Sequence, residues 1–152
     1  MKDHVLIVDD NRDLADVMAD AIQAFGYSAK AVYNGEDALR ENATFLPDMV
    51  LVDLDMPGLN GYETIERMRQ KRPATEIIMV AVTGLTSDEH QRRAYEAGFD
   101  LFVAKPIGAE KLRELVALLD PAIAAEATAG PWEGGPITFP KPLEQLYRIT
   151  RE

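Results

Sequence analysis

Short apolar runs alternate with amphipathic stretches along the first 120 residues, and polar residues, glycine or proline follow each run. Apolar runs of about four to eight residues are typical of strands buried on both faces of a parallel sheet. A run that is shorter or more polar suits a strand near the edge of the sheet. This pattern predicts strands at residues 4–8, 28–33, 49–52, 77–82 and 100–104.

The stretches between these runs carry apolar residues at helical spacing and start with helix-capping residues. Asn11 and Ser87 stand at N-cap positions, and Gly26 and Gly98 stand where a helix should end. The pattern predicts helices at residues 12–25, 36–42, 62–71, 87–97 and 110–119. In the third of these helices we expect Arg69 to face solvent.

Five strands that alternate with five helices predict an α/β fold, a doubly wound five-stranded parallel sheet with helices on both faces. The second strand is polar enough for a sheet edge, whereas the first, third and fourth are more apolar. This difference fits the strand order 2-1-3-4-5.

Composition narrows the class of protein. Apolar residues make up 47% and charged residues 28% of the 152-residue chain, which has no cysteine and a net charge of −10. The negative charge argues against nucleic acid and anionic membranes as partners. No stretch approaches the roughly 20 apolar residues of a membrane span, and the N-terminus lacks a signal-peptide pattern. We therefore expect a cytoplasmic protein.

The composition changes after residue 120, which predicts one domain at 1–120 and a tail at 121–152. The tail begins as a linker rich in proline, glycine and alanine, and residues 141–152 could add a short helix. With four acidic and three basic side chains, the tail is not a basic arm. It is either a loosely packed extension or a docking or dimerisation segment.

Polar residues follow four of the apolar strands. Asp9 and Asp10 follow the first strand, Asp53 the third, Thr83 the fourth and Lys105 the fifth. Each alone has a simpler interpretation, such as a helix cap or a turn residue. The carboxyl ends of parallel strands meet at one edge of the sheet, however, so these side chains should converge.

Three converging carboxylates repel one another unless a cation neutralises them. Mg²⁺ suits a site of a few carboxylates that also receives water and a phosphoryl group. A carboxylate such as Asp53 can attack phosphorus and form an acyl phosphate. Lys105 and Thr83 would then bind phosphoryl oxygen atoms, and Gly84 would leave room for the group.

At these residues the chain resembles the receiver domain of two-component response regulators, with its flavodoxin-like fold. The resemblance covers residues 1–120. It is carried by Val8-Asp9-Asp10-Asn11, Leu51-Val52-Asp53-Leu54-Asp55-Met56-Pro57-Gly58-Leu59-Asn60-Gly61, Val82-Thr83-Gly84, Ala97-Gly98-Phe99-Asp100 and Ala104-Lys105-Pro106.

The resemblance implies that Asp53 accepts a phosphoryl group from a phosphohistidine of a sensor histidine kinase or a phosphotransfer protein. It implies that Mg²⁺ (or Mn²⁺) binds Asp10, Asp53 and the backbone carbonyl of Asp55, with Asp9 assisting. It also implies a cis peptide bond between Lys105 and Pro106. Self-phosphorylation and slow autodephosphorylation would be the only reactions, so the chain is not expected to be an enzyme.

The resemblance further implies a switch in which Thr83 moves toward the phosphoryl group and Phe102 turns inward. Phenylalanine has no hydroxyl, so coupling at this position would depend on packing, and Phe102 could simply be a packed strand residue. The surface that changes would be residues 87–119, where a downstream protein would bind.

Two positions near Asp53 lead to a hypothesis about the lifetime of the phosphoryl group. Asp55 adds a carboxylate beside the site, and Leu85 lies two residues after Thr83. We hypothesise that Asp55 tunes the lifetime electrostatically and that Leu85 restricts water. Unchanged phosphoryl half-lives in Leu85→Glu and Asp55→Asn would contradict this hypothesis.

Three alternatives remain open from the sequence. Asp53-Leu54-Asp55 also resembles the nucleophile motif of haloacid-dehalogenase-like phosphatases, although that motif normally lies on the first strand. The chain could be a single-domain regulator, which its start at Met1 favours, or a receiver excised from a hybrid histidine kinase or a longer regulator. It could act as a monomer or as a homodimer.

Overall fold

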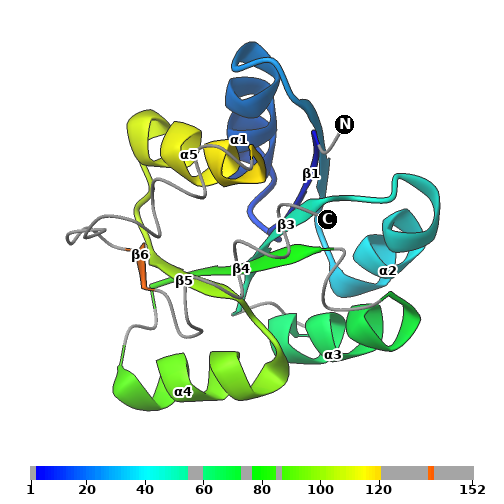
Figure 1. Ribbon diagram of the computed structural model, residues 1–152, viewed down its shortest axis with the longest axis vertical. Helices are drawn as coiled ribbons and strands as arrows, with labels where there is room; N and C mark the ends of the chain where they lie inside the picture. The colour runs from blue at the N-terminus through cyan, green and yellow to red at the C-terminus, as the bar shows by residue number, and fades with distance from the viewer. Residues whose placement is uncertain (1–2, 55–59, 73–76, 85–86, 121–136, 139–152) are drawn as a thin grey trace.

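A computed structural model describes residues 3–54, 60–72, 77–84, 87–120 and 137–138, the last two by their backbone. Helices and strands alternate along the chain and form three layers, with a central sheet between two layers of helices (Figure 1). The elements are β1 (His4–Val8), α1 (Arg12–Ala24), β2 (Ser28–Val32), α2 (Gly35–Thr44), β3 (Met49–Asp53), α3 (Gly61–Lys71), β4 (Ile78–Thr83), α4 (Asp88–Ala97), β5 (Leu101–Ala104), α5 (Ala109–Val116), the short 3₁₀-helix η1 (Ala117–Leu119) and β6 (Ile137–Thr138).

The helix caps follow the sequence prediction. The side chain of Asn11 accepts a hydrogen bond from the backbone N–H of Leu14 at 3.1 Å, which begins α1. Ser87 caps α4 in the same way. Gly26 after α1 and Gly98 after α4 have positive φ angles of 103° and 115°, a conformation that favours glycine. Local chemistry therefore sets these helix ends.

The sheet has the order β2-β1-β3-β4-β5-β6, and its first five strands are parallel. The predicted order 2-1-3-4-5 is confirmed. The sixth strand was not predicted: β6 pairs antiparallel with β5, and its two residues lie opposite Phe102 and Val103. Two residues are too few to show a period-2 pattern, so a strand of this length leaves no signal in the sequence.

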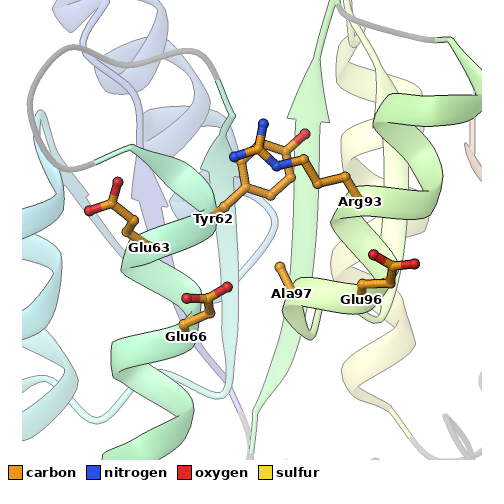
Figure 2. Close-up of a pocket in the computed structure, with 6 residues that line it drawn as sticks. All are labelled: Tyr62, Glu63, Glu66, Arg93, Glu96 and Ala97. Atoms are coloured by element: carbon orange, nitrogen blue, oxygen red, sulfur yellow. The ribbon is translucent and has the colours of Figure 1, made fainter.

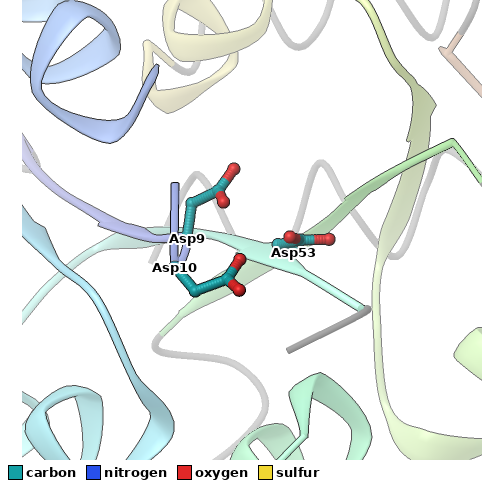
Figure 3. A group of neighbouring side chains, drawn as sticks. All are labelled: Asp9, Asp10 and Asp53. Atoms are coloured by element: carbon teal, nitrogen blue, oxygen red, sulfur yellow. The ribbon is translucent and has the colours of Figure 1, made fainter. Parts of the chain in front are cut away.

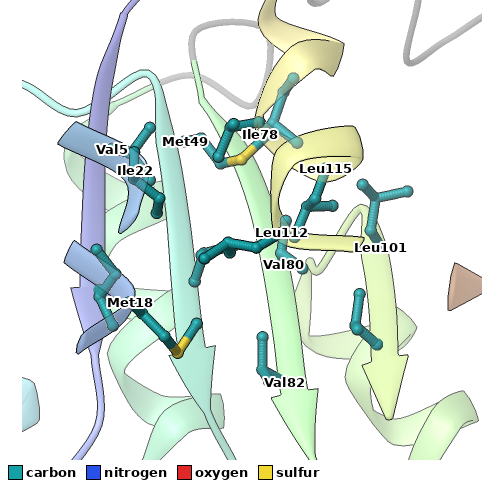
Figure 4. Packing of buried hydrophobic residues seen from close by; sticks show 14 of the residues in the cluster. Val5, Met18, Ile22, Met49, Ile78, Val80, Val82, Leu101, Leu112 and Leu115 are labelled. Carbon is teal, nitrogen blue, oxygen red and sulfur yellow. The ribbon is translucent and has the colours of Figure 1, made fainter. Parts of the chain in front are cut away.

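Both faces of the sheet are covered by helices. Alternate strand residues pack against α1 and α5 on one face, including Val5, Met49 and Val80 (Figure 4). On the other face, strand residues such as Leu6, Val50 and Met79 pack against α2, α3 and α4. All five residues of β3 are buried, as expected of a central strand.

The helices differ from prediction in detail. The helix α2 is longer than the predicted 36–42, and the predicted helix at 110–119 is divided into α5 and η1. Val17, whose spacing placed it with the apolar positions of α1, is 64% exposed. Each helix in the described part of the chain is too short or too polar to cross a bilayer. The short helix predicted within residues 141–152 lies outside the described residues.

Candidate functional site

Three carboxylates converge at the carboxyl edge of the sheet. Asp9 and Asp10 follow β1, and Asp53 is the last residue of the neighbouring strand β3. One carboxylate oxygen from each lies within 4.8 Å of the others, and Figure 3 shows them gathered at the ends of the two strands. Asp9 and Asp53 are 4% and 7% exposed, while Asp10 is exposed. The predicted convergence is confirmed.

Lys105 brings a positive charge to this cluster from the end of β5. Its Nζ lies 3.2 Å from Oδ2 of Asp9, to which it donates a hydrogen bond, and 3.4 Å from Oδ2 of Asp53. Burial of the ammonium opposes its charge, but Asp53 and Asp9 outweigh burial and raise the pKa of Lys105 above its ordinary value. Lys105 is therefore held in its charged form between the two carboxylates.

The charges of the cluster do not balance. Among the described residues, three carboxylates face one ammonium, which leaves two negative charges in a largely buried setting. Oxygen ligands at the rim of a sheet, one of them exposed, are what a hard divalent cation such as Mg²⁺ prefers. The residues present therefore fit the metal that the resemblance implies, with Asp9, Asp10 and Asp53 available to hold it.

Thr83 ends β4, between β3 and β5. It is 1% exposed, and its backbone carbonyl accepts a hydrogen bond from the backbone N–H of Lys105 at 2.9 Å. A Cβ added to Gly84 would meet no atom of the described residues within 4 Å, so within that part of the chain space is open after Thr83. The peptide bond between Lys105 and Pro106 is cis, as the resemblance implied.

Phe102 points into the core. Its side chain is 1% exposed and belongs to the apolar cluster between the sheet and α2, α3 and α4. The packing that the sequence allowed for this residue is therefore present. Its role as a switch stays a prediction, as do those of Asp55 and Leu85, which lie outside the described residues.

Gly61 has a role that the sequence did not reveal. A Cβ at this position would lie 2.6 Å from the backbone oxygen of Asp53 and 2.9 Å from Cα of Leu54. Any larger residue would push α3 away from the end of β3. The first turn of α3 is thus packed directly on the backbone of Asp53. In the sequence Gly61 appeared only as the last residue of the motif around Asp53, since close approach of distant backbone segments leaves no local pattern.

The prediction that Arg69 faces solvent is wrong. Its side chain is 13% exposed and forms an ion pair at 2.8 Å with Asp100, which is 2% exposed. Arg69 also donates to the backbone carbonyls of Ile77 and Gly98, and Asp100 accepts from the backbone N–H of Met79. The signal available was Asp100 itself, a buried acid that requires a cation.

Comparisons with known proteins agree with this geometry. The chain matches the family model described as "Response regulator receiver domain" over residues 5–117. It is 31% identical over 114 residues to the sensor histidine kinase RcsC of Salmonella typhi, covering 75% of this chain and 12% of that protein. It is 32% identical over 139 residues to the sensory transduction protein RegX3 of Mycobacterium bovis, covering 88% of this chain and 59% of that protein.

The fold matches solved structures as well. A CheY-like response regulator receiver domain from Methanospirillum hungatei superposes with a TM-score of 0.72 at 23% identity, covering 86% of this chain and 100% of that one. This likeness concerns the fold. The chain spans less than two thirds of the length of both RcsC and RegX3.

Proposed function

Because the chain belongs to the family of response regulator receiver domains, which serve phosphorelay signalling, we propose that Asp53 is its phosphoacceptor. The chain is a signalling module rather than a classical enzyme. The phosphoryl donor is a phosphohistidine of a sensor histidine kinase or of a phosphotransfer protein. The observation that carries the proposal is the cluster at the sheet edge, where Lys105 balances only part of the charge on Asp9, Asp10 and Asp53.

The proposed reaction needs an oxygen nucleophile and a bound phosphoryl group. A carboxylate oxygen of Asp53 attacks phosphorus, and a P–O bond forms as the P–N bond of the phosphohistidine breaks. The electron pair of the broken bond returns to the imidazole, which takes up a proton. Asp53 carries the phosphoryl group as an acyl phosphate until water attacks phosphorus in a slow autodephosphorylation.

The neighbouring residues position this reaction. Lys105, already 3.4 Å from Asp53, neutralises charge on the transferred group, and the hydroxyl of Thr83 donates to a phosphoryl oxygen. Asp9, Asp10 and Asp53, with the backbone carbonyl of Asp55, hold Mg²⁺ (or Mn²⁺). When bound, this ion supplies positive charge for phosphoryl oxygens. Gly61 keeps α3 against the backbone of Asp53, so the strand end stays in place.

The first experiment is labelling with a small phosphodonor. We expect acetyl phosphate to add one phosphoryl group per chain, measured by intact mass, and mapping should place it on Asp53. Labelling should fail in Asp53→Asn and without a divalent ion, and it should persist in the control Asp20→Asn, which removes an exposed acid from α1. Full labelling of Asp53→Asn would contradict the proposal.

We propose that the signal leaves through residues 87–119, which bind a downstream protein. Support comes from the burial of Phe102 beneath this surface and from the short polar helix α4. Beryllofluoride with Mg²⁺ mimics the phosphorylated state, so a pulldown can compare the treated wild type with Asp53→Asn. A phosphorylation-dependent contact predicts a protein that binds the first and not the second.

The domain organisation proposed is a receiver at 1–120 followed by a tail at 121–152. The chain matches 12% of RcsC and 59% of RegX3, so a single-domain regulator and a receiver within a longer protein both remain consistent. The pairing of β6 with β5 supports a tail that docks on its own domain rather than one that extends freely. A cytoplasmic location belongs to the same proposal, and a homodimer is its alternative to a monomer.

Two observations argue against the alternative of a haloacid-dehalogenase-like phosphatase. The other two acids of the cluster, Asp9 and Asp10, lie upstream of Asp53 and directly follow β1, and the family match covers most of the chain. A receiver forms its phosphoenzyme stoichiometrically. We therefore expect no turnover of p-nitrophenyl phosphate beyond one equivalent in the presence of Mg²⁺.

A further inference from the structure

A groove of about 360 Å³ lies between α3 and α4, and none of the described residues that line it belongs to the acidic cluster at the strand ends. Figure 2 shows the ring of Tyr62 projecting from α3 toward α4, with the guanidinium of Arg93 lying over it. The residues that line the groove are Tyr62, Glu63, Glu66, Arg93, Glu96 and Ala97. A groove of this size can hold a single side chain of a partner.

The groove is negatively charged. Glu63, Glu66 and Glu96 contribute three carboxylates, and Arg93 contributes the one cation among the described residues that line the groove. Glu66 and Glu96 form no hydrogen bond or ion pair with any residue in the described part of the chain, and both are exposed. Their charge is available to a ligand.

Tyr62 supplies a second, independent observation. It is 7% exposed, its ring packs edge-on against Phe99, and its hydroxyl oxygen has no hydrogen-bond partner among the described residues. A buried polar atom without a partner is rare in native proteins and costs stability. The hydroxyl can both donate and accept a hydrogen bond, so a ligand in this acidic groove that carries N–H donors could satisfy it.

Arg93 shows that a guanidinium fits over the Tyr62 ring, but Arg93 does not satisfy the polar groups of the groove. Its Cζ lies 4.1 Å from the centroid of the Tyr62 ring, a cation–π contact. Yet Arg93 forms no ion pair with the groove's glutamates and does not donate to the Tyr62 hydroxyl, as far as the structure describes them. Because Arg93 is exposed and tethered to α4, it can leave the ring without disturbing the core.

We propose that this groove binds an arginine or lysine side chain of a basic protein partner, which replaces Arg93 over the Tyr62 ring. An incoming guanidinium has five N–H donors. These donors can form hydrogen bonds with the Tyr62 hydroxyl and with the carboxylates of Glu66 and Glu96 at the same time. Arg93, which is tethered to α4, forms none of these bonds in the described part of the structure. Charge complementarity selects a basic partner for this acidic chain. The proposal does not depend on phosphorylation of Asp53.

The test uses the full chain and a short alanine-rich peptide that carries one arginine. The same peptide with citrulline, which has the shape of arginine without its charge, is the matched control. Chemical-shift changes in amide NMR spectra report binding, in excess Mg²⁺ so that the acidic cluster does not attract the peptide. We expect the arginine peptide to shift residues 62–66 and 93–97, and the citrulline peptide to shift none.

Variants of the groove residues distinguish specific binding in the groove from general attraction between opposite charges. We expect Glu66→Gln and Glu96→Gln each to weaken binding about tenfold, the loss of one charge-assisted contact. Glu110→Gln, which removes an exposed acid from α5, should have no effect. Arg93→Ala should strengthen binding several-fold because it empties the ring face. Tyr62→Phe, which keeps the ring and removes only the unpartnered hydroxyl, should fold and bind several-fold more weakly.

Three results would overturn the proposal. These are shifts scattered over all acidic surfaces, equal affinity in Glu66→Gln and Glu110→Gln, and no gain of affinity in Arg93→Ala. Labelling of Asp53 by acetyl phosphate is measured separately on the same variants. Its failure would concern the proposed phosphoacceptor and leave the groove intact.

Discussion

Two groups of buried charges lie at opposite edges of the same sheet. At the carboxyl edge, Lys105 stands between Asp9 and Asp53, with Asp10 beside them. At the amino edge, Arg69 from α3 meets Asp100, which precedes β5. Both groups are formed by residues distant in sequence, and both place an acid under 10% exposed beside a cation.

The two groups differ in how fully their charges are balanced. Arg69 and Asp100 carry one positive and one negative charge, which balance, and backbone groups of Ile77, Gly98 and Met79 add further hydrogen bonds to the pair. The carboxyl-edge group has three carboxylates for one ammonium. A balanced buried pair holds elements together, whereas an unbalanced group lowers stability until a ligand completes it. Because both groups contain buried acids, the excess of negative charge, rather than burial, identifies the carboxyl-edge group as the functional site.

The largest effect is expected from Arg69→Ala. Removal of one partner leaves Asp100 buried with an uncompensated charge, which costs about 3–5 kcal/mol of unfolding free energy. Urea denaturation measures this loss. Arg67→Ala on the same helix is the control, because Arg67 is exposed and its loss should cost less than about 0.5 kcal/mol. Equal losses in the two variants would show that the amino-edge pair contributes little.

Addition of Mg²⁺ should stabilise the folded protein by binding to the acidic cluster at the carboxyl edge and not to the balanced pair at the amino edge. At a concentration of about 100 times its dissociation constant, a ligand of the folded state adds roughly 2.7 kcal/mol. Thermal unfolding with Mg²⁺ and with EDTA measures this gain. It should be retained in Arg67→Ala and lost in Asp10→Asn, which removes one proposed ligand. A gain of equal size in Asp10→Asn would place the metal elsewhere.

Asp53→Asn should raise stability when no divalent ion is present. The substitution keeps the shape of the side chain and removes one of the two surplus negative charges, a gain of about 1 kcal/mol. The sign is opposite to that of Arg69→Ala, which is the sharpest contrast between the two edges. Urea denaturation in EDTA measures this gain in stability. A loss of more than about 1 kcal/mol in Asp53→Asn would contradict a surplus of negative charge at the carboxyl edge.

The smallest effect concerns pH. Because the pKa of Lys105 is raised in the folded state, its stabilising contribution is complete below the unfolded pKa of about 10.4. It is lost as the pH rises through the higher folded pKa. The difference in stability between wild type and Lys105→Gln, a few tenths of a kcal/mol, should shrink above about pH 10.4.

The amino edge supplies the control for this pH series. Arginine stays protonated throughout this range. The difference between wild type and Arg69→Ala should therefore stay constant. If both differences shrink together, the change reflects general unfolding in alkali rather than titration of Lys105.

Much of the fold was predictable from local patterns. Apolar runs located five strands, and caps such as Asn11 and Ser87 set the helix ends, because both depend on neighbouring residues. The topology followed from the alternation of strands and helices. That topology then predicted the convergence of Asp9, Asp10, Asp53 and Lys105, since parallel strands end at one edge.

Other features depended on contacts between distant segments. Arg69 lies on a helix among exposed basic residues, and nothing in its neighbourhood distinguishes it from Arg67. Its burial follows from Asp100, 31 residues later. The close approach of Gly61 to the backbone of Asp53 is likewise invisible in sequence. Val17 shows the opposite error, since helical spacing alone does not tell which apolar residue the core receives.

The sequence by itself determined the strand order, the caps of α1 and α4 and the acids that converge on Asp53, because each follows from short-range chemistry and the rules of parallel sheets. Only the tertiary structure decided which charges are balanced and which are not. It paired Arg69 with Asp100, added β6 to the sheet, and brought Tyr62, Arg93 and the glutamates Glu66 and Glu96 to one groove. Charge balance is a property of the folded structure, since it depends on residues that come together only when the chain folds.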